Sequence, residues 1–137
     1  MLDIQTIHHV SLPVTDLERA RRFYEDVLGL TKIERPNFPF PGAWYAAGDR
    51  HVHLIVSERQ TFREGKSVDS RDIHFAIRVK SYQQALEYLR SKGYRTDSGD
   101  DLRRTRENPH GTAGFPQIYI LDPDRNLIEI NAERLDQ

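Results

Sequence analysis

The chain has 137 residues, of which 37% are hydrophobic and 30% charged, and its net charge is -1. This composition is typical of one folded domain, and the near-neutral charge gives no reason to expect nucleic acid or a membrane surface as a partner. The absence of cysteine excludes disulfides, thiolate catalysis and thiolate-bound zinc. A strand-like pattern begins near residue 6 and no apolar run is long enough to cross a bilayer, so we expect a cytoplasmic protein without a signal peptide.

The first half of the chain predicts one helix followed by three strands, with another strand before it. The elements are, in chain order, a strand at 7–14, a helix at 17–27, and strands at 30–35, 44–47 and 51–57. Thr15 or Asp16 is the expected N-terminal cap of the helix, and Gly29 its C-terminal stop. The proline-rich segment 36–42 predicts a loop, because its prolines cannot donate ladder hydrogen bonds.

The second half predicts the same order again. The polar segment 59–71 is the expected linker between the halves. The elements are a strand at 72–79, a helix at 82–91, and strands at 94–98, 117–121 and 127–131. Ser81 is the expected cap of this helix and Gly93 its stop. A polar loop over 100–114 separates two of the strands, and loops of that length without structure of their own are more often functional than idle.

Short motifs repeat between the halves. His9–Val14 recurs as His74–Val79 with an offset of 65 residues, and the motif around His53 recurs around Glu129 with an offset of 76. We expect most of the 11 extra residues in the long polar loop of the second half. Duplicated units of this size commonly share one interior.

These patterns predict an α+β fold built from two paired βαβββ modules, at about 5–58 and 72–133. The modules are expected to form a curled, cup-shaped mixed sheet with the helices on the outside. We expect residues 1–137 to form a single domain.

Strand alternation places His9, His53, His74 and Glu129 on the face of the sheet opposite the helices. One histidine in a strand is usually exposed or hydrogen-bonded, but these residues match pairwise across the repeat. We therefore predict that they hold one divalent metal ion per site. Imidazole and carboxylate ligands suit Zn, Ni, Co, Fe or Mn, and the sequence does not choose among them.

The other three histidines fit a metal site less well. The same alternation sends His8 to the helix-packed face. His51 shares the face of His53 but lies nearer the turn. His110 falls in the long loop and is expected to be a substrate or surface residue.

Several further residues are candidates for contact with a substrate: Phe38, Phe40, Trp44, Arg78, Arg103 and Tyr119. The first three aromatic residues either wall a cavity or pack in the core. Arg78 shares the face of His74 and would hold a substrate anion or form a salt bridge at the rim. Arg103 contributes to a basic loop that would suit a carboxylate or phosphate group, unless the loop is simply solvated.

Two segments resemble the vicinal oxygen chelate superfamily: HHVSLPVTDLERARRFYEDVLGL, which begins at His8, and DPDRNLIEI, which begins at Asp122. That superfamily includes glyoxalase I, methylmalonyl-CoA epimerase, fosfomycin-resistance proteins, bleomycin-binding proteins and extradiol dioxygenases. The resemblance covers about residues 7–132. It implies paired βαβββ modules with a metal in the cup, and it also implies a homodimer that acts on a small molecule.

The resemblance supports three of the four candidate ligands, because the ligands of the family match His9, His74 and Glu129. The fourth position carries Glu or Gln in typical glyoxalases and epimerases, whereas this chain has His53. That departure weakens a strict assignment to glyoxalase I.

The chemistry that the family shares is capture of two adjacent substrate oxygens by a metal, which acts as a Lewis acid and stabilises an oxyanion. Glu129 is the expected catalytic base if it can leave the metal; otherwise a metal-bound hydroxide would serve. Our first hypothesis is a glyoxalase-like lyase or isomerase. The alternatives are an extradiol-type dioxygenase, a fosfomycin-resistance-type thiol transferase and a metal-free drug-binding protein. A fourth ligand at His53 argues against the dioxygenase, and the ligand set as a whole argues against the last alternative.

Overall fold

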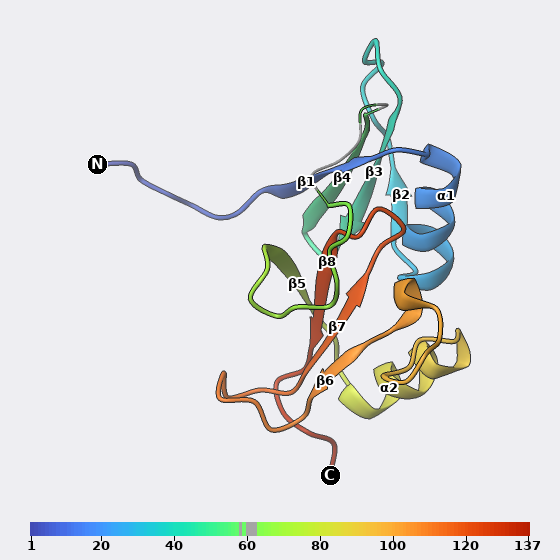
Figure 1. Cartoon of the computed structure of the whole chain (residues 1–137). Helices are drawn as coiled ribbons and strands as arrows, with labels where there is room; N and C mark the ends of the chain where they lie inside the picture. Colours follow the sequence, from blue (N-terminus) through green and yellow to red (C-terminus); the bar gives the residue numbers. More distant parts are fainter. Residues whose placement is uncertain (58, 60–62) are drawn as a thin grey trace. The chain divides into compact units, whose positions relative to one another are not determined.

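The computed structural model describes residues 1–57, 59 and 63–137 of the chain. The chain divides into two compact units, Met1–Thr61 and Phe62–Gln137 (Figure 1). Part of the predicted linker, residues 60–62, lies outside the described residues, as does residue 58. Each unit is described by itself below.

The first unit contains a four-stranded sheet and one helical segment. Its elements are β1 (His9–Val14), α1 (Leu17–Arg21), the π-helix η1 (Arg22–Val27), β2 (Thr31–Ile33), β3 (Gly42–Ala47) and β4 (Arg50–Val56). The strand order is β1-β4-β3-β2. β1 runs parallel to β4, and the other pairs are antiparallel. This is the predicted β-α-β-β-β order.

The helical segment begins and ends where the sequence predicts. The Asp16 side chain accepts the N–H of Arg19 at 3.0 Å and so caps α1. Gly29 has a φ of 70°, in the left-handed region that glycine adopts without strain. The second half of the segment is nevertheless wound as a π-helix, in which the N–H of Leu28 bonds to the carbonyl of Phe23 at 3.0 Å.

This helical segment covers one face of the first sheet. The Tyr24 ring stacks on Tyr45 of β3 with centroids 6.1 Å apart, and both residues are fully buried. The Tyr45 hydroxyl and the Arg21 guanidinium each donate to the Glu25 carboxylate at 2.8 Å. The hydrogen bond from Arg21, with that from Tyr45, holds the pKa of Glu25 below its ordinary value. Val52 of β4 is in register with Tyr45, so it lies on the helix-covered face as well.

Gly42 lies where the first sheet has no room for a side chain. A Cβ at this position would be 2.3 Å from the Leu54 carbonyl oxygen and 2.9 Å from a guanidinium nitrogen of Arg35. We expect Gly42→Ala to lower the free energy of unfolding by about 1–3 kcal/mol, because the backbone of β4 would have to move. Gly99→Ala is the matched control, since a Cβ there meets no described atom within 4 Å. Equal urea midpoints for the two variants would contradict the expectation.

The second unit has the same architecture. Its elements are β5 (His74–Arg78), α2 (Tyr82–Ser91), the 3-10 helix η2 (Asp101–Arg103), β6 (Arg106–Asn108), β7 (Gln117–Leu121) and β8 (Leu127–Asn131). The strand order is β5-β8-β7-β6, with β5 parallel to β8 and the other pairs antiparallel. The predicted α+β class with two βαβββ modules is therefore confirmed. The cup that the two modules would form together stays a prediction, as does their union in one domain.

One predicted strand of the second unit is wrong. Segment 94–98 is not a strand, and only Arg95 makes an isolated bridge, to Arg104. The edge strand is instead β6, which lies inside the predicted loop 100–114. Its sequence, Arg-Glu-Asn, has little intrinsic preference for strands, so pairing with β7 defines it. By contrast, α2, β7 and β8 have the predicted bounds.

Helix α2 identifies the covered face of the second sheet. Arg90 of α2 donates to Glu107 of β6 at 2.8 Å, and Glu107 is in register with Ile118 of β7. Ile118 in turn lies opposite Ile130 of β8, and both isoleucines are buried. Directly opposed residues share a face of a sheet, so this face is the one toward α2. Glu129 precedes Ile130 and lies on the other face, as alternation predicts.

The hydrogen-bond register is the same in the two sheets. The in-register neighbours of His53 are Ser11 and Trp44, and those of Glu129 are Ala76 and Tyr119. The match of His53 with Glu129 across the repeat therefore holds at the level of backbone pairing.

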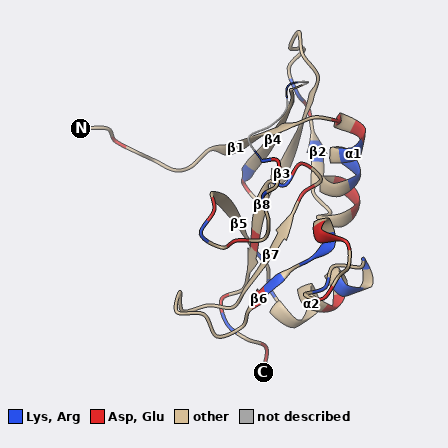
Figure 2. Cartoon of the chain, viewed as in Figure 1, with Lys and Arg blue, Asp and Glu red and all other residues tan. Residues whose placement is uncertain are grey.

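Charged residues of both signs are intermixed in each unit (Figure 2). They are frequent on α1, whereas β7 carries none. Within the described residues, no helix is long and apolar enough to cross a membrane.

Candidate metal centre

In the first unit His53 lies between two aromatic rings. The Trp44 ring stacks on it with centroids 3.9 Å apart and an interplanar angle of 4°. The His9 ring lies 4.1 Å away at 23°. Only 6% of His53 is exposed. Two predicted ligands of the first module are thus neighbours, on the sheet face opposite the helix.

The surroundings of His53 keep its imidazole neutral. Burial lowers the pKa of His53 from 6.5 to about 4, and the nearby His9, His51 and His8 add to the effect because a second positive charge would be repelled. A metal binds the neutral form of imidazole, so the ring is ready for a ligand role at neutral pH.

The position of His8 differs from the one that strand alternation predicted. Alternation placed it on the helix-packed face, but β1 begins only at His9, so the rule does not extend to His8. Its Nδ1 lies 2.8 Å from His9 Nδ1, and its ring lies 5.4 Å from that of His51. His51 is where alternation predicts, with Nδ1 at 3.3 Å from His53 Nε2. Four histidines therefore gather on one side of the first module.

The aromatic candidates lie beside this histidine cluster. Phe38 stacks on Phe40 at 5.2 Å and lies 6.1 Å from Trp44. The Arg35 guanidinium lies over Phe38 at 4.8 Å. Phe38 and Phe40 remain 38% and 40% exposed, so they do not pack in the core. Their contact with a substrate stays a prediction.

In the second unit the contacts of His74 fix its tautomer. Its Nδ1 lies 2.7 Å from the Asp72 carbonyl oxygen, which can only accept, so Nδ1 carries the proton. Nε2 of the neutral ring then bears a lone pair, and it lies 3.2 Å from Oε1 of Glu129. A carboxylate oxygen cannot donate either. Two facing acceptors at this distance require a cation, which is a proton or a metal ion.

Glu129 is buried and held by three donors. Only 5% of the residue is exposed. Its Oε1 accepts from the Tyr119 hydroxyl at 3.0 Å and from Gln117 Nε2 at 3.4 Å, and its Oε2 accepts from Asn131 Nδ2. Burial, together with the hydrogen bond to Glu129, raises the pKa of Tyr119 to about 12, so this hydroxyl stays a donor at neutral pH. The carboxylate is thus fixed in orientation with one oxygen toward His74.

The two arginine candidates have different surroundings. Arg78 Nε donates to Oδ1 of Asn131, which links it indirectly to Glu129. Arg103 donates to the Lys92 carbonyl at 2.6 Å and lies 5.7 Å from the Tyr94 ring, at the C-terminal end of α2. For both residues, contact with a substrate stays a prediction.

Each module thus brings together the two predicted ligands that it contains, His9 with His53 and His74 with Glu129. Across residues 1–57, 59 and 63–137, no three His, Asp or Glu side chains are arranged to hold a metal ion. The donor set fits a metal best at the pair of His74 and Glu129, where two acceptors face each other.

Sequence reasoning missed three residues, two that contact Glu129 and one that contacts His74. Alternation alone would have found Gln117, which shares the face of Tyr119 on β7, and Asn131, which shares the face of Glu129 on β8. No pattern signalled Asp72, because its contribution to His74 is a backbone carbonyl.

The match to a family model covers residues 6–130, and the chain belongs to the Glyoxalase/Bleomycin resistance protein/Dioxygenase superfamily. Among its relatives, Glyoxylase I 4 of Arabidopsis thaliana is 27% identical over 94% of this chain and 71% of that protein. Glutathione transferase FosA of Serratia marcescens is 26% identical over 96% of this chain and 84% of that protein.

Solved structures show the same fold. A Bacillus anthracis protein described as a glyoxalase family member superposes with a TM-score of 0.76. The two sequences are 21% identical, and the match covers 96% of this chain and 98% of the other. The predicted resemblance to the superfamily is confirmed.

Proposed function

We propose that the chain is a divalent-metal-dependent, glyoxalase-like lyase or isomerase that acts on a small substrate with two adjacent oxygens. The observation that carries the proposal is the pair of acceptors at 3.2 Å, His74 Nε2 and Glu129 Oε1, of which Glu129 is buried and the His74 side chain is 25% exposed. We propose His9 and His53 as the ligands from the first module. A bound divalent ion would supply Lewis acidity toward the two substrate oxygens.

Residues of the chain would supply the base, orient it and contact the substrate. Glu129 is the proposed base for a carbon-bound proton of the substrate. Tyr119 and Asn131 would orient its carboxylate while the proton moves, because both donate to it. Phe38, Phe40 and Trp44 offer an apolar wall for the rest of the substrate, and Arg78 is the proposed contact for a substrate anion.

A fosfomycin-resistance-type thiol transferase is the second candidate. Two observations favour it: the similarity to FosA over 84% of that protein, and the departure from the typical glyoxalase pattern at His53. Both candidates use the same proposed ligands and differ in the substrate, so an activity assay distinguishes them.

Metal content is the first test. Protein purified without chelators is expected to hold about one divalent ion per chain, measured by inductively coupled plasma mass spectrometry, because two acceptors that face each other favour a bound cation. Protein that holds no metal, and takes up none when Zn²⁺, Ni²⁺ or Mn²⁺ is added, would contradict the proposal.

Parallel assays separate the reactions. Loaded protein is given methylglyoxal with glutathione, then fosfomycin with glutathione, and then a catechol with recording of oxygen uptake. Turnover of the first pair supports the glyoxalase-like reaction, and turnover of the second supports the transferase. Oxygen uptake would instead favour an extradiol-type dioxygenase.

We also propose a cytoplasmic homodimer, and light scattering after size exclusion measures the oligomeric state.

A further inference from the structure

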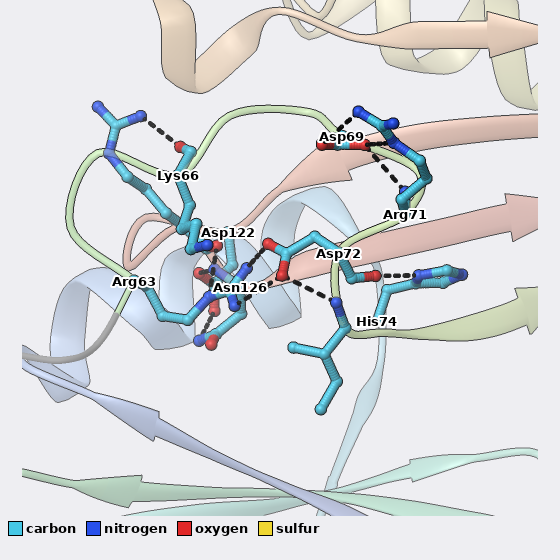
Figure 3. Close-up of polar contacts among 10 residues, drawn as sticks. Arg63, Lys66, Asp69, Arg71, Asp72, His74, Asp122 and Asn126 are labelled. Atoms are coloured by element: carbon cyan, nitrogen blue, oxygen red, sulfur yellow. Dashed lines mark hydrogen bonds and ion pairs between the residues drawn. The ribbon is translucent and has the colours of Figure 1, made fainter.

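We propose that Arg63 and Asp72 form a positioning pair that fixes the tautomer and orientation of His74 relative to Glu129. The inference rests on the proposed function only in taking Nε2 of His74 as a metal ligand. It concerns contacts within the second unit alone (Figure 3).

The first step is the peptide group between Asp72 and Ile73. Its carbonyl accepts Nδ1–H of His74 at 2.7 Å, and its N–H donates to Oδ1 of Asp72 at 2.8 Å. The N–H and C=O of a trans peptide point in opposite directions. The Asp72 carboxylate therefore holds one side of this peptide plane while His74 binds the other, and rotation of the plane would break both hydrogen bonds.

The second step is the fixing of the Asp72 carboxylate by Arg63. One guanidinium nitrogen donates to Oδ1 at 3.3 Å and the other pairs with Oδ2. The side chains of Arg63 and Asp72 are 12% and 16% exposed, so water screens this pair much less than a surface pair. A two-point contact of this kind restricts the orientation of the carboxylate as well as its position.

The third step links the pair to the strand that carries Glu129. Arg63 Nε donates to the Arg125 carbonyl at 3.2 Å. Arg125 belongs to the turn that leads into β8, and its φ is 66°. The Asp122 carboxylate holds this turn by accepting the N–H groups of Asp124 and Asn126 at 2.9 and 2.8 Å. Arg63 thus ties the segment before β5 to the turn before β8, the two strands that carry His74 and Glu129.

An ion pair that served only stability would leave the tautomer of His74 unchanged when it is removed. Removal of a positioning pair would change the tautomer of His74, because release of the peptide plane frees Nδ1 from its acceptor. We therefore expect the variant Arg63→Met to have a mixture of tautomers at His74, and a weaker metal site as a result. Loss of the outer partner of a metal-binding histidine typically costs 10- to 100-fold in metal affinity.

The experiment reads the tautomer directly by ¹⁵N NMR of the imidazole groups in chelator-treated protein, with His74→Gln to assign the signal. In the wild type Nδ1 of His74 is expected to carry a proton that is hydrogen-bonded to the Asp72 carbonyl, whether or not a second proton lies between Nε2 and Glu129. In Arg63→Met the Nδ1 site is expected to be only partly protonated. Arg71→Met is the matched control: Arg71 lies in the same segment, is 89% exposed and pairs only with Asp69 among the ion pairs described. An unchanged His74 signal in Arg63→Met would overturn the proposal.

A titration with Zn²⁺ gives the second readout. Arg63→Met is expected to bind Zn²⁺ more weakly than the wild type, by up to the roughly 10- to 100-fold that loss of the Asp72 acceptor itself would cost, whereas Arg71→Met is expected to bind as tightly as the wild type. If Arg63→Met does not fold, Arg63→Lys replaces it, because a single ammonium group cannot bond Asp72 at two points and Arg125 as well. Wild-type protein that binds no metal would contradict the proposed function alone, since the tautomer comparison needs no metal.

Discussion

Glu129→Gln is expected to abolish metal binding and to leave the chain folded. Glutamine keeps the shape of glutamate, but its amide is a poor metal ligand and carries no negative charge. Loss of an outer partner already costs about 10- to 100-fold in metal affinity, so loss of the ligand itself should cost more than roughly 100-fold. Zn²⁺ titration and metal analysis measure this effect.

Some loss of stability accompanies this substitution. The new NH₂ group would face donors from Tyr119 and Gln117 or from Asn131, so we expect a decrease of about 1–3 kcal/mol in the free energy of unfolding. Glu133→Gln is the matched control, because it makes the same chemical change at an exposed residue just beyond β8. Equal metal affinity in the two variants would contradict a ligand role for Glu129.

Mild acid is expected to destabilise the metal-free protein through His53. The pKa of His53 is about 4 in the folded state, against an ordinary value of 6.5. The unfolded chain therefore takes up the proton first, and the free energy of unfolding falls as the pH drops from about 6.5 to about 4. The expected loss is about 2 kcal/mol by pH 5 and at most about 3 kcal/mol below pH 4.

Urea unfolding followed by circular dichroism, in the presence of a chelator, measures this dependence. His53→Phe keeps an aromatic ring beside Trp44 but cannot titrate, so its stability should vary less between pH 7 and 5. His110→Gln is the control, because His110 is exposed and lies in a loop. The wild type, His53→Phe and His110→Gln have the same carboxylates, so the contribution of these groups to the pH dependence of stability cancels in the comparison. Parallel pH profiles for the wild type and His53→Phe would contradict the expectation.

The sequence predicted most of the fold, because each module combines clear alternation with capped helices. Asp16 and Ser81 cap the two helices as expected, and β7 and β8 have the expected bounds. The edge strand β6 was not predicted, and the reason is physical. A three-residue edge strand of polar residues has no periodicity to detect, and it exists because β7 offers a partner.

The candidate site could be predicted in part. Alternation was sufficient to place each candidate ligand on the correct face within its own module. The pattern could not reveal contacts made by the backbone, such as the Asp72 carbonyl that binds His74. It also could not reveal ion pairs between distant loops, because the Arg63–Asp72 contact depends on the path of the intervening chain.

Trp44 is the only tryptophan of the chain, and its indole lies face to face with the His53 imidazole at 3.9 Å. The tryptophan fluorescence of the protein therefore originates beside a proposed ligand. Protonation of that imidazole, or its coordination to a paramagnetic ion such as Ni²⁺ or Co²⁺, alters the electronic surroundings of the indole directly. Tryptophan fluorescence can therefore follow protonation of His53 or metal binding to it in the first module, without a label and without turnover.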